Sequence, residues 1–534
     1  MNVRVDHKVG PMKYVLIAAA IVFLLSLAVF AVRLLSVLEY WDLFRTVGDE
    51  ELHVYGIWKV QRGFPLYEYP DAIFYGLTGY NYLFYFFYAA VLSVFNITNS
   101  GILLHGKLLT LSFAVFGSFM HWRLMCYLAR PYDNPASRVF FGIIAFIVWF
   151  GTHITGWWAM TTRPDIPAAA LAVSAFFIFL RGYDENSARK ILAASVLFFL
   201  AWSFKQSYIW IFAGTVLYLL VQKRDWRRSL ELAVPWSLMV MAVFLIGGDN
   251  YKINTVAANL GQNPSLAHFL YMISRGLLVS PFFWAFWPYL LLVIHRSGGF
   301  DKIGFERVFR QRLVPLVYMA VIALAGSGYA LTLIGTNRNQ LIEASIVAST
   351  LSSVLLSAMV SMKEGAIRSK AAVAATSLIL CMAVFPAAQL IFFNKIGCLA
   401  LATKEEHRQK RSLGQYFDTL PKPLFNNIYP FDLPWYSTNG EYPVVIFDAL
   451  AHLQFKKLYG GGISGLAAIR HFRSLVINRD DCHTYYAALK AGYTPRKMPD
   501  IGLSYMAREW NFVPKLLVLV LEDAPGEAKG GRDL

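Results

Sequence analysis

The residues that could do chemistry in this sequence lie in short polar stretches between long apolar runs. The first stretch carries Asp49, Glu50 and Glu51, and His53 follows Asp49 at the spacing that places both on one helix face. Acids in the first turn of a helix meet the positive end of its dipole, so helix capping explains them. A carboxylate at a membrane interface could instead remove a proton from an acceptor hydroxyl. Both interpretations stay open.

The second stretch, TTRPD, places Arg163 and Asp165 between two apolar segments. An ionisable side chain at membrane depth costs about 2.5–3.5 kcal/mol on insertion scales, so each of these residues needs a compensating partner. They could compensate each other as a structural ion pair, or they could bind a substrate.

The third stretch, FKQS, carries Lys205 and Gln206 between two short apolar runs. We expect two helices to meet here, with Lys205 in the turn between them. The compact ammonium group of a lysine suits a phosphate. A lysine can also extend to the membrane surface without any ligand, so this alternative stays open as well.

The fourth stretch, GTNRNQLIE, carries Asn337, Arg338 and Glu343, and it could be only a polar turn between helices. Taken together, the four stretches place acids, amides and cations at the ends of separate membrane segments. This arrangement is expected of an interfacial site for an anionic lipid and a polar partner.

A longer polar segment, residues 247–276, is amphipathic and has Lys252 and Arg275 near its ends. It could lie on the membrane surface, as amphipathic segments do. It could equally pack over a helix bundle. Arg275 is therefore either a candidate substrate ligand or part of a packing helix, and both interpretations stay open.

The elements that must position these residues follow from the composition. The chain has 534 residues, of which 57% are hydrophobic and only 15% charged. Soluble domains carry about 25% charged residues, so this chain cannot be an ordinary soluble enzyme. Residues 14–32 and 371–393 are uncharged and long enough to cross hydrocarbon as helices. Shorter apolar segments lie near 80–97, 103–122, 139–157, 165–180, 191–203, 207–221, 230–247, 281–294, 313–334 and 340–360.

The formal net charge of +16 is explained by where the basic residues lie. Loops rich in Lys and Arg stay on the cytoplasmic side of a membrane, so we read the charge as a topology signal and expect no nucleic-acid partner. Five loops qualify, at 123–138, 181–190, 223–228, 296–312 and 363–370. The N-terminus is then cytoplasmic, and 38–79 forms a first outer loop. This assignment requires that 80–97 does not cross fully, so we expect it to be re-entrant, interfacial or part of a broken helix.

The composition becomes more polar after Asn394, and short apolar runs bounded by turn residues predict strands at 442–447, 474–477 and 516–521. Helical spacing at 449–459 and 484–491 completes a small α/β domain. We therefore predict a mainly α fold: a polytopic membrane bundle, 1–395, of about 11–13 transmembrane or re-entrant helices, with an extracytoplasmic α/β domain at 396–534. Cys398 and Cys482 could pair in that domain or stay as free thiols.

The positively charged N-terminus and first helix, the first outer loop, and the later stretches TTRPD, FKQS and GTNRNQLIE, in this order, resemble the GT-C superfamily of polytopic glycosyltransferases. The similarity is greatest to the protein-mannosyltransferase and aminoarabinose-transferase-like branch, which includes bacterial enzymes of lipid A and cell-surface glycans. It rests on GDEELHVYGIWKVQRGFPLYEYPD, TTRPD, FKQS and GTNRNQLIE. One departure concerns the His-Pro-Pro or Lys-Pro element that many members have before the second membrane segment. This chain has AIFYGLTGY there, which leaves open which groups hold the phosphate.

The resemblance implies a role for each matching residue. Asp49 would be the base that activates the acceptor hydroxyl, and Glu50 its orienting neighbour. Arg163 and Asp165 match an R-x-D-like element, and Lys205 matches a basic residue expected at the carrier phosphate. Asn337 and Glu343 match a G-x-N-x-N-x-x-x-E loop. His53, Gln206, Arg275 and Arg338 are further candidate substrate ligands.

The implied function is transfer of a sugar from a polyprenyl-phosphate donor to a lipid, cell-surface glycan or protein acceptor, at the outer face of a bacterial inner membrane. Membrane lipids are the other expected partners. The sequence assigns no metal ligands, and a divalent cation stays an open possibility. The alternatives are a transporter or flippase of lipid-linked saccharides and a membrane scaffold without catalytic activity. Charged stretches at helix ends rather than at the midplane, and no evident inverted repeat, speak against a transporter.

Overall fold

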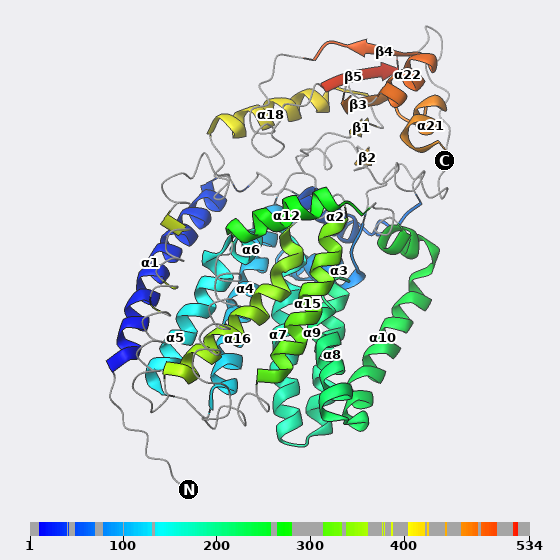
Figure 1. Ribbon diagram of the computed structural model, residues 1–534. Helices are drawn as coiled ribbons and strands as arrows, with labels where there is room; N and C mark the ends of the chain where they lie inside the picture. Colours follow the sequence, from blue (N-terminus) through cyan, green and yellow to red (C-terminus); the bar gives the residue numbers. More distant parts are fainter. Residues whose placement is uncertain are drawn as a thin grey trace.

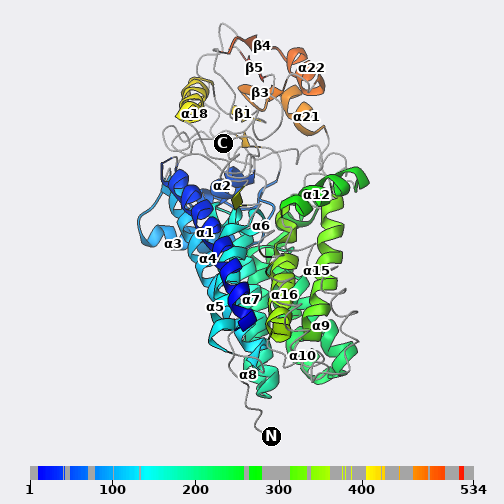
Figure 2. The ribbon, with the colours of Figure 1, turned by 60° about the vertical axis from the view of Figure 1, so that its left-hand side comes forward.

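The computed structural model of this chain is a bundle of helices with a small sheet at one end (Figures 1 and 2). It describes residues 10–39, 41, 49–69, 78–99, 101–130, 134–257, 264–279, 313–333, 338–360, 376, 379, 386–387, 404–421, 424–426, 444–445, 461–478, 482–498 and 516–521. The predicted mainly α membrane bundle with a small α/β part is confirmed.

Six helices of the described chain are long and apolar enough to cross a membrane. They are α1 (Gly10–Glu39), α4 (Gly101–Leu128), α7 (Asp165–Asp184), α10 (Trp226–Lys252) with η5 (Ile253–Ala257), α15 (Val314–Thr332), and η8 (Arg338–Leu341) with α16 (Ile342–Val360). A bent pair gives a seventh, formed by α5 (Pro135–Phe146) with η2 (Ile147–Gly151) and by α6 (His153–Gly156) with η3 (Trp158–Met160). The predicted segments 281–294 and, apart from four single positions, 371–393 lie outside the described residues.

Shorter helices complete the bundle, and the turns between successive helices lie alternately at its two ends. Helix α8 (Ala188–Phe204) packs antiparallel to α7, and α9 (Trp210–Leu217) with η4 (Tyr218–Lys223) follows it. At one end, the Arg228 guanidinium of α10 donates to Asn186 in the α7–α8 turn. At the other end, the start of α7 meets the α8–α9 turn and η8. The polar stretches therefore lie at one end of the bundle, and the basic turns at 181–190 and 223–228 at the other.

Helix α3 (Tyr82–Val94) explains how the first loop can share an end with the other polar stretches. Its 13 residues span about 20 Å, against a hydrocarbon thickness of about 30 Å. The Asn81 side chain before it donates to the Trp202 carbonyl at the end of α8 (2.7 Å). The Ile97 carbonyl after it accepts from Gln61 of α2 (Asp49–Gln61; 3.0 Å). Both ends of α3 are thus tied to elements that contact the polar stretches, which is compatible with the expected re-entrant or interfacial segment at 80–97.

The segment that leads into TTRPD is shaped by an interrupted helix. Thr152 is extended, which ends η2, and its hydroxyl accepts from the Thr155 N–H at the start of α6. Arg33, buried in α1, donates to the carbonyls of Phe150 (3.0 Å) and Thr152 (3.2 Å). The carbonyl groups exposed by the break are thereby satisfied. Helix α7 starts directly after Pro164, which has no N–H to leave unpaired.

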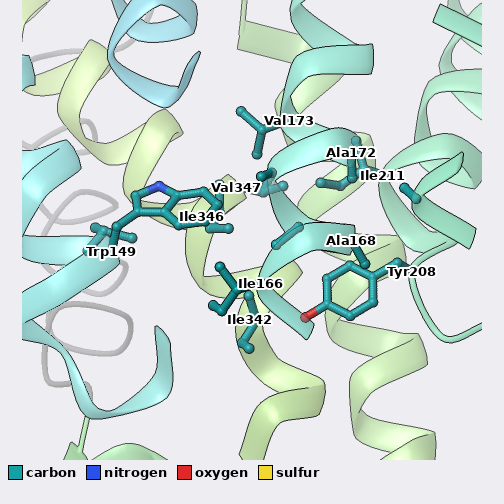
Figure 3. Packing of buried hydrophobic residues seen from close by; sticks show 14 of the residues in the cluster. Trp149, Ile166, Ala168, Ala172, Val173, Tyr208, Ile211, Ile342, Ile346 and Val347 are labelled. Carbon is teal, nitrogen blue, oxygen red and sulfur yellow. The ribbon is translucent and has the colours of Figure 1, made fainter. Parts of the chain in front are cut away.

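Helices α7 and α16 form the centre of the bundle, and Figure 3 shows their packing. Ile166 and Val173 of α7 lie toward Ile342, Ile346 and Val347 of α16, with Trp149 beside them. Ala168 and Ala172 lie on the other side of α7, toward Tyr208 and Ile211. Small alanines allow α7 to approach its neighbours closely. One of the two central helices therefore begins at Asp165.

The C-terminal part holds a five-stranded mixed sheet in the order β2-β1-β3-β5-β4. The strands β1, β2 and β3 are parallel, and β5 is antiparallel to β3 and β4. Its elements are α18 (Lys404–Asp418), β1 (Leu424–Asn426), β2 (Val444–Val445), α21 (Gly462–Ala468), β3 (Ser474–Asn478), α22 (Cys482–Lys490), β4 (Tyr493–Arg496) and β5 (Leu516–Leu521). Leu424 and Phe425 face opposite sides, so α18 covers one face and α21 and α22 cover the other.

Several sequence predictions for this part can be compared with the structure. The predicted strands correspond to β2, β3 and β5, and the predicted helix at 484–491 corresponds to α22. The sequence did not reveal α18, β1, α21 or β4. The predicted helix at 449–459, Cys398 and the side chain of Cys482 lie outside the described residues. The single segment expected at 247–276 contains the end of α10, the turn η5 and the separate helix α12 (Leu266–Val279).

Candidate active site

Asp165, in the first turn of α7, is the centre of a buried polar cluster. Its carboxylate is fully buried. Oδ1 accepts hydrogen bonds from Lys205 Nζ (2.5 Å) and from Asn339 Nδ2 (2.9 Å). Oδ2 accepts from Arg163 Nε (3.2 Å). The TTRPD, FKQS and GTNRNQLIE stretches, which are far apart in the sequence, therefore meet on one carboxylate.

Aromatic rings surround the two cations of this cluster. The Arg163 guanidinium lies 4.6 Å from the centre of the Trp158 ring and donates to the Tyr80 hydroxyl (3.1 Å). Lys205 Nζ lies 5.2 Å from the centre of the same Tyr80 ring. Cation–π contacts offset part of the cost of removing these charges from water. Tyr80, at the end of the first loop, thus joins that loop to the cluster.

Lys205 ends α8 in an extended conformation, which turns its side chain away from the helix and toward α7. The next residue, Gln206, donates through Nε2 to the Gly79 carbonyl (3.0 Å). In the described structure Gln206 therefore fastens the end of the first loop to the α8–α9 turn. This contact positions Tyr80 beside the cluster.

Helix α2 carries the acidic residues of the first loop, and it contacts the cluster through Glu50. The Glu50 carboxylate is fully buried, and Oε1 accepts from the Thr162 backbone N–H (2.6 Å), directly before Arg163. Asp49 is the first residue of α2, and its side chain lies outside the described set. The start of α2 is thus fixed beside the cluster, which is where a base in its first turn would have to be.

His53, one turn along α2, is buried against the same aromatic residues. Its ring lies 4.7 Å from the ring of Tyr80, and Nδ1 is 3.5 Å from the Tyr85 hydroxyl. Burial, together with the positive charge of Arg163, holds the pKa of His53 well below its usual value. The imidazole is therefore neutral at physiological pH, which suits hydrogen bonding rather than charge pairing with a phosphate.

Of the remaining candidate residues, only Glu343 has a side chain that the structure describes. The Glu343 carboxylate is buried at the start of α16 and accepts from the Ile211 N–H (3.3 Å), so it connects α16 to α9. Asn337 and the side chains of Arg338 and Arg275 lie outside the described residues. The amide that reaches Asp165 is Asn339, two residues after the predicted Asn337.

Sequence reasoning missed four residues of the site: Tyr80, Trp158, Thr162 and Asn339. Two of them had a signal. Asn339 is the second asparagine of GTNRNQLIE, and Thr162 is the second threonine of TTRPD. Tyr80 was one of many aromatic residues near 80–88, so its type alone could not separate it from an interfacial belt.

The ion pair expected within TTRPD is present, since Arg163 binds Asp165. Lys205 is a second cation on the same carboxylate, so the pair is part of a larger cluster. Among the described residues, no group of three or more His, Cys, Asp or Glu side chains is placed to hold a metal ion.

Comparison with known proteins gives matches by structure. No protein-family model matches the chain, and no curated protein matches its sequence. The crystal structure of ArnT from Cupriavidus metallidurans bound to undecaprenyl phosphate matches with a TM-score of 0.54, at 12% identity, over 94% of this chain and 98% of that one. Its apo form gives a TM-score of 0.55 at 13% identity, over 93% of this chain and 97% of that one.

An oligosaccharyltransferase from Archaeoglobus fulgidus, tethered to an acceptor peptide, also matches. Its TM-score is 0.52 at 13% identity, over 92% of this chain and 73% of that one. At such low identity the likeness concerns the fold. The chain therefore shares its fold with ArnT and with the archaeal oligosaccharyltransferase.

Proposed function

We propose that this protein is a GT-C membrane glycosyltransferase. It would transfer a hexose or pentose from a polyprenyl-phosphate donor to a lipid, cell-surface glycan or protein acceptor. The observation that carries the proposal is the Glu50–Thr162 contact (2.6 Å), which fixes the acidic start of α2 beside the buried cations Arg163 and Lys205. Sugar transfer from a lipid phosphate needs both a base and cations, so their proximity supports this reaction.

The fold supports the donor class. ArnT, which shares the fold, was crystallised with undecaprenyl phosphate. In this chain, Lys205 Nζ has three N–H donors, and among the described residues only Asp165 accepts one of them. The other two could donate to the oxygens of a phosphate bound beside the cluster at the end of α8.

The proposed reaction is a single displacement. Asp49 takes the proton of the acceptor hydroxyl as that oxygen attacks the anomeric carbon of the sugar. The bond between the anomeric carbon and the phosphate oxygen breaks, and polyprenyl phosphate leaves with the bonding electrons. Lys205 and Arg163 stabilise the charge that grows on the phosphate. Glu50, held by Thr162, orients the start of α2, and Asp165 holds both cations in place.

The same proposal includes an arrangement in the membrane. Residues 1–395 would form the catalytic bundle with the first outer loop at 38–79, and 396–534 the extracytoplasmic domain. The N-terminus would be cytoplasmic in a bacterial inner membrane. The other proposed substrate-side residues are His53, Gln206, Arg275, Asn337, Arg338 and Glu343. Of these, Glu343 would act by holding α16 against α9.

The test is a transfer assay in proteoliposomes with radiolabelled polyprenyl-phosphate sugars and extracted lipid and glycan acceptors. We expect Asp49→Asn to reduce transfer by at least about 1,000-fold without changing the thermal unfolding midpoint, because only proton removal is lost. Glu51→Gln, which makes the same chemical change two positions later, is the matched control and should transfer normally.

Full transfer by Asp49→Asn would refute the base assignment. Movement of the labelled lipid across the bilayer without any transfer would identify a flippase instead. Absence of both activities with every donor would favour a scaffold. Addition of EDTA in the same assay shows whether a divalent cation takes part.

A further inference from the structure

We propose that Asn339, Tyr208 and His53 form the subsite for the sugar itself, by receiving its hydroxyl groups beside the Asp165 cluster. The inference rests on the proposed function. It names the residues that would bind the sugar part of the donor, which the shared fold does not identify. It starts from three buried polar atoms that have no hydrogen-bond partner in the described part of the chain: Asn339 Oδ1, Tyr208 Oη and His53 Nε2.

The orientation of the Asn339 amide is fixed by its neighbour. The atom that lies 2.9 Å from the Asp165 carboxylate must be the nitrogen, since a carboxylate accepts hydrogen bonds and the amide oxygen cannot donate. Asn339 Oδ1 is therefore left as a pure acceptor in a side chain that is 3% exposed. A ligand that meets it must bring an O–H or N–H group, and a fully ionised phosphate has neither.

Tyr208 adds a hydroxyl from the α8–α9 turn. Its side chain is 4% exposed, and Lys205 Nζ lies 5.9 Å from the centre of its ring. In Figure 3 the ring lies beside Ala168, and its hydroxyl oxygen points toward the side where Ile166 and Ile342 begin their helices. These helices start at Asp165 and, directly after the turn η8 that carries Asn339, at Ile342, so the hydroxyl faces the polar end of the bundle.

His53 adds a third group from α2. Its ring packs on Tyr80, whose hydroxyl accepts from Arg163. The His53 side chain is 5% exposed, and Nδ1 approaches Tyr85, so Nε2 is the nitrogen left for a ligand. Arg163 and Lys205 disfavour a proton on the imidazole, while Asp165 favours it, and burial decides for the neutral ring.

A sugar fits this set better than a phosphate does. The three groups are neutral and include a pure acceptor, a hydroxyl that both donates and accepts, and an imidazole. A sugar hydroxyl likewise donates and accepts, whereas a phosphate is best bound by cations and N–H donors. Buried polar atoms without a partner are rare in proteins, and three of them beside one charged cluster point to an occupant. The cations Lys205 and Arg163 then serve the phosphate, and the neutral groups serve the sugar.

The experiment measures binding to purified protein of bare undecaprenyl phosphate and of undecaprenyl phosphates that carry glucose, mannose, galactose, N-acetylglucosamine or arabinose. We expect at least one sugar to bind about 10-fold or more tightly than the bare carrier. Tyr208→Phe and His53→Phe keep the rings and remove the polar atoms. Each should reduce that preference about 3- to 10-fold, the effect of one lost hydrogen bond, and leave binding of the bare carrier unchanged.

The matched control is Ser353→Ala, which removes a buried hydroxyl that also has no partner among the described residues but lies in the middle of α16. It should leave both affinities unchanged. Three results would each overturn the subsite. The first is that Tyr208→Phe and His53→Phe bind the best sugar-bearing carrier as tightly as the wild-type protein does. The second is that they lose as much affinity for the bare carrier as for the sugar-bearing one, and the third is that the wild-type protein prefers no sugar over the bare carrier. Failure of bare undecaprenyl phosphate to bind the wild-type protein would instead refute the donor class and with it the proposed function.

Discussion

The Asp165 carboxylate accepts hydrogen bonds from Arg163, Lys205 and Asn339 and has no contact with solvent. Two cations on one buried carboxylate leave a local excess of positive charge. Such an arrangement is costly in a low-dielectric interior unless every donor and acceptor is satisfied. Two cations held at one place suit the binding of a phosphate, so the cluster fits the proposed polyprenyl-phosphate donor.

The first prediction follows from this charge balance. Asp165→Asn removes the carboxylate and leaves two buried cations, and we expect it to lower the free energy of unfolding by about 3–5 kcal/mol. Lys205→Met leaves the Arg163–Asp165 pair intact and should cost less, although transfer should be lost. Thermal and denaturant unfolding in detergent measures both.

The double variant Asp165→Asn with Lys205→Met is the control. Removing the second charge relieves the repulsion, so the double variant should be more stable than Asp165→Asn by about 1–3 kcal/mol. Purely additive losses would mean that the two residues do not interact as the 2.5 Å contact indicates.

At the scale of elements, the site depends on how closely helices approach the TTRPD segment. Gly106 of α4 packs directly on Thr162, and a Cβ at Gly106 would lie 2.6 Å from Thr162 Cγ2. Thr162 in turn donates its backbone N–H to Glu50. The absence of a side chain at one position of α4 thus helps to place both the cluster and the acidic start of α2.

The second prediction concerns this packing. Gly106→Ala should push Thr162 away from α4, with a cost of about 1–3 kcal/mol in stability and a 10- to 100-fold loss of transfer, about what a shift near 1 Å causes. Gly142→Ala in α5, where the nearest atom would lie 3.8 Å away, is the matched control and should leave both unchanged. Normal transfer by Gly106→Ala would show that the approach of α4 does not set the site.

The interrupted elements show the limits of local sequence patterns. The apolar run at 139–157 predicted one helix, and the structure breaks it at Thr152 and bends it by 52°. No proline or glycine pair marks the break. Arg33, 119 positions earlier, supplies the donors that make it stable. Such a partner cannot be read from the segment itself.

At the scale of the whole molecule, the polar site and the sheet lie at the same end of the bundle (Figure 1). Ile253 of η5 packs against the core of the C-terminal sheet. Two residues earlier, the Tyr251 hydroxyl donates to Asn81 (2.6 Å), directly after Tyr80. The C-terminal part is therefore joined to the site through η5.

The third prediction is the orientation of this assembly. In a variant whose native cysteines are replaced by serine, Tyr486→Cys on the exposed face of α22 should react with a membrane-impermeant maleimide in intact cells. Arg189→Cys, in the basic turn at the opposite end, should react only after permeabilisation, because Lys- and Arg-rich turns stay cytoplasmic. Equal labelling of both would contradict the proposed topology.

The sequence by itself determined the class of this protein and the positions of its polar stretches. Charged residues are costly beside hydrocarbon, so Arg163, Asp165 and Lys205 stand out in any fold that such a chain adopts. The sequence also predicted three strands of the C-terminal sheet, because β-branched runs between turn residues are a local signal.

The tertiary structure decided which of these residues meet. Asp165 joins Lys205 across 40 positions and Asn339 across 174, and no local pattern encodes contacts over such separations. It also decided where α3 lies, because Asn81 ties its start to the end of α8 and Gln61 of α2 ties its end to the first loop. A local sequence pattern shows that a charged residue is costly beside hydrocarbon and therefore needs a partner. Which residue becomes that partner depends on how all the helices pack together.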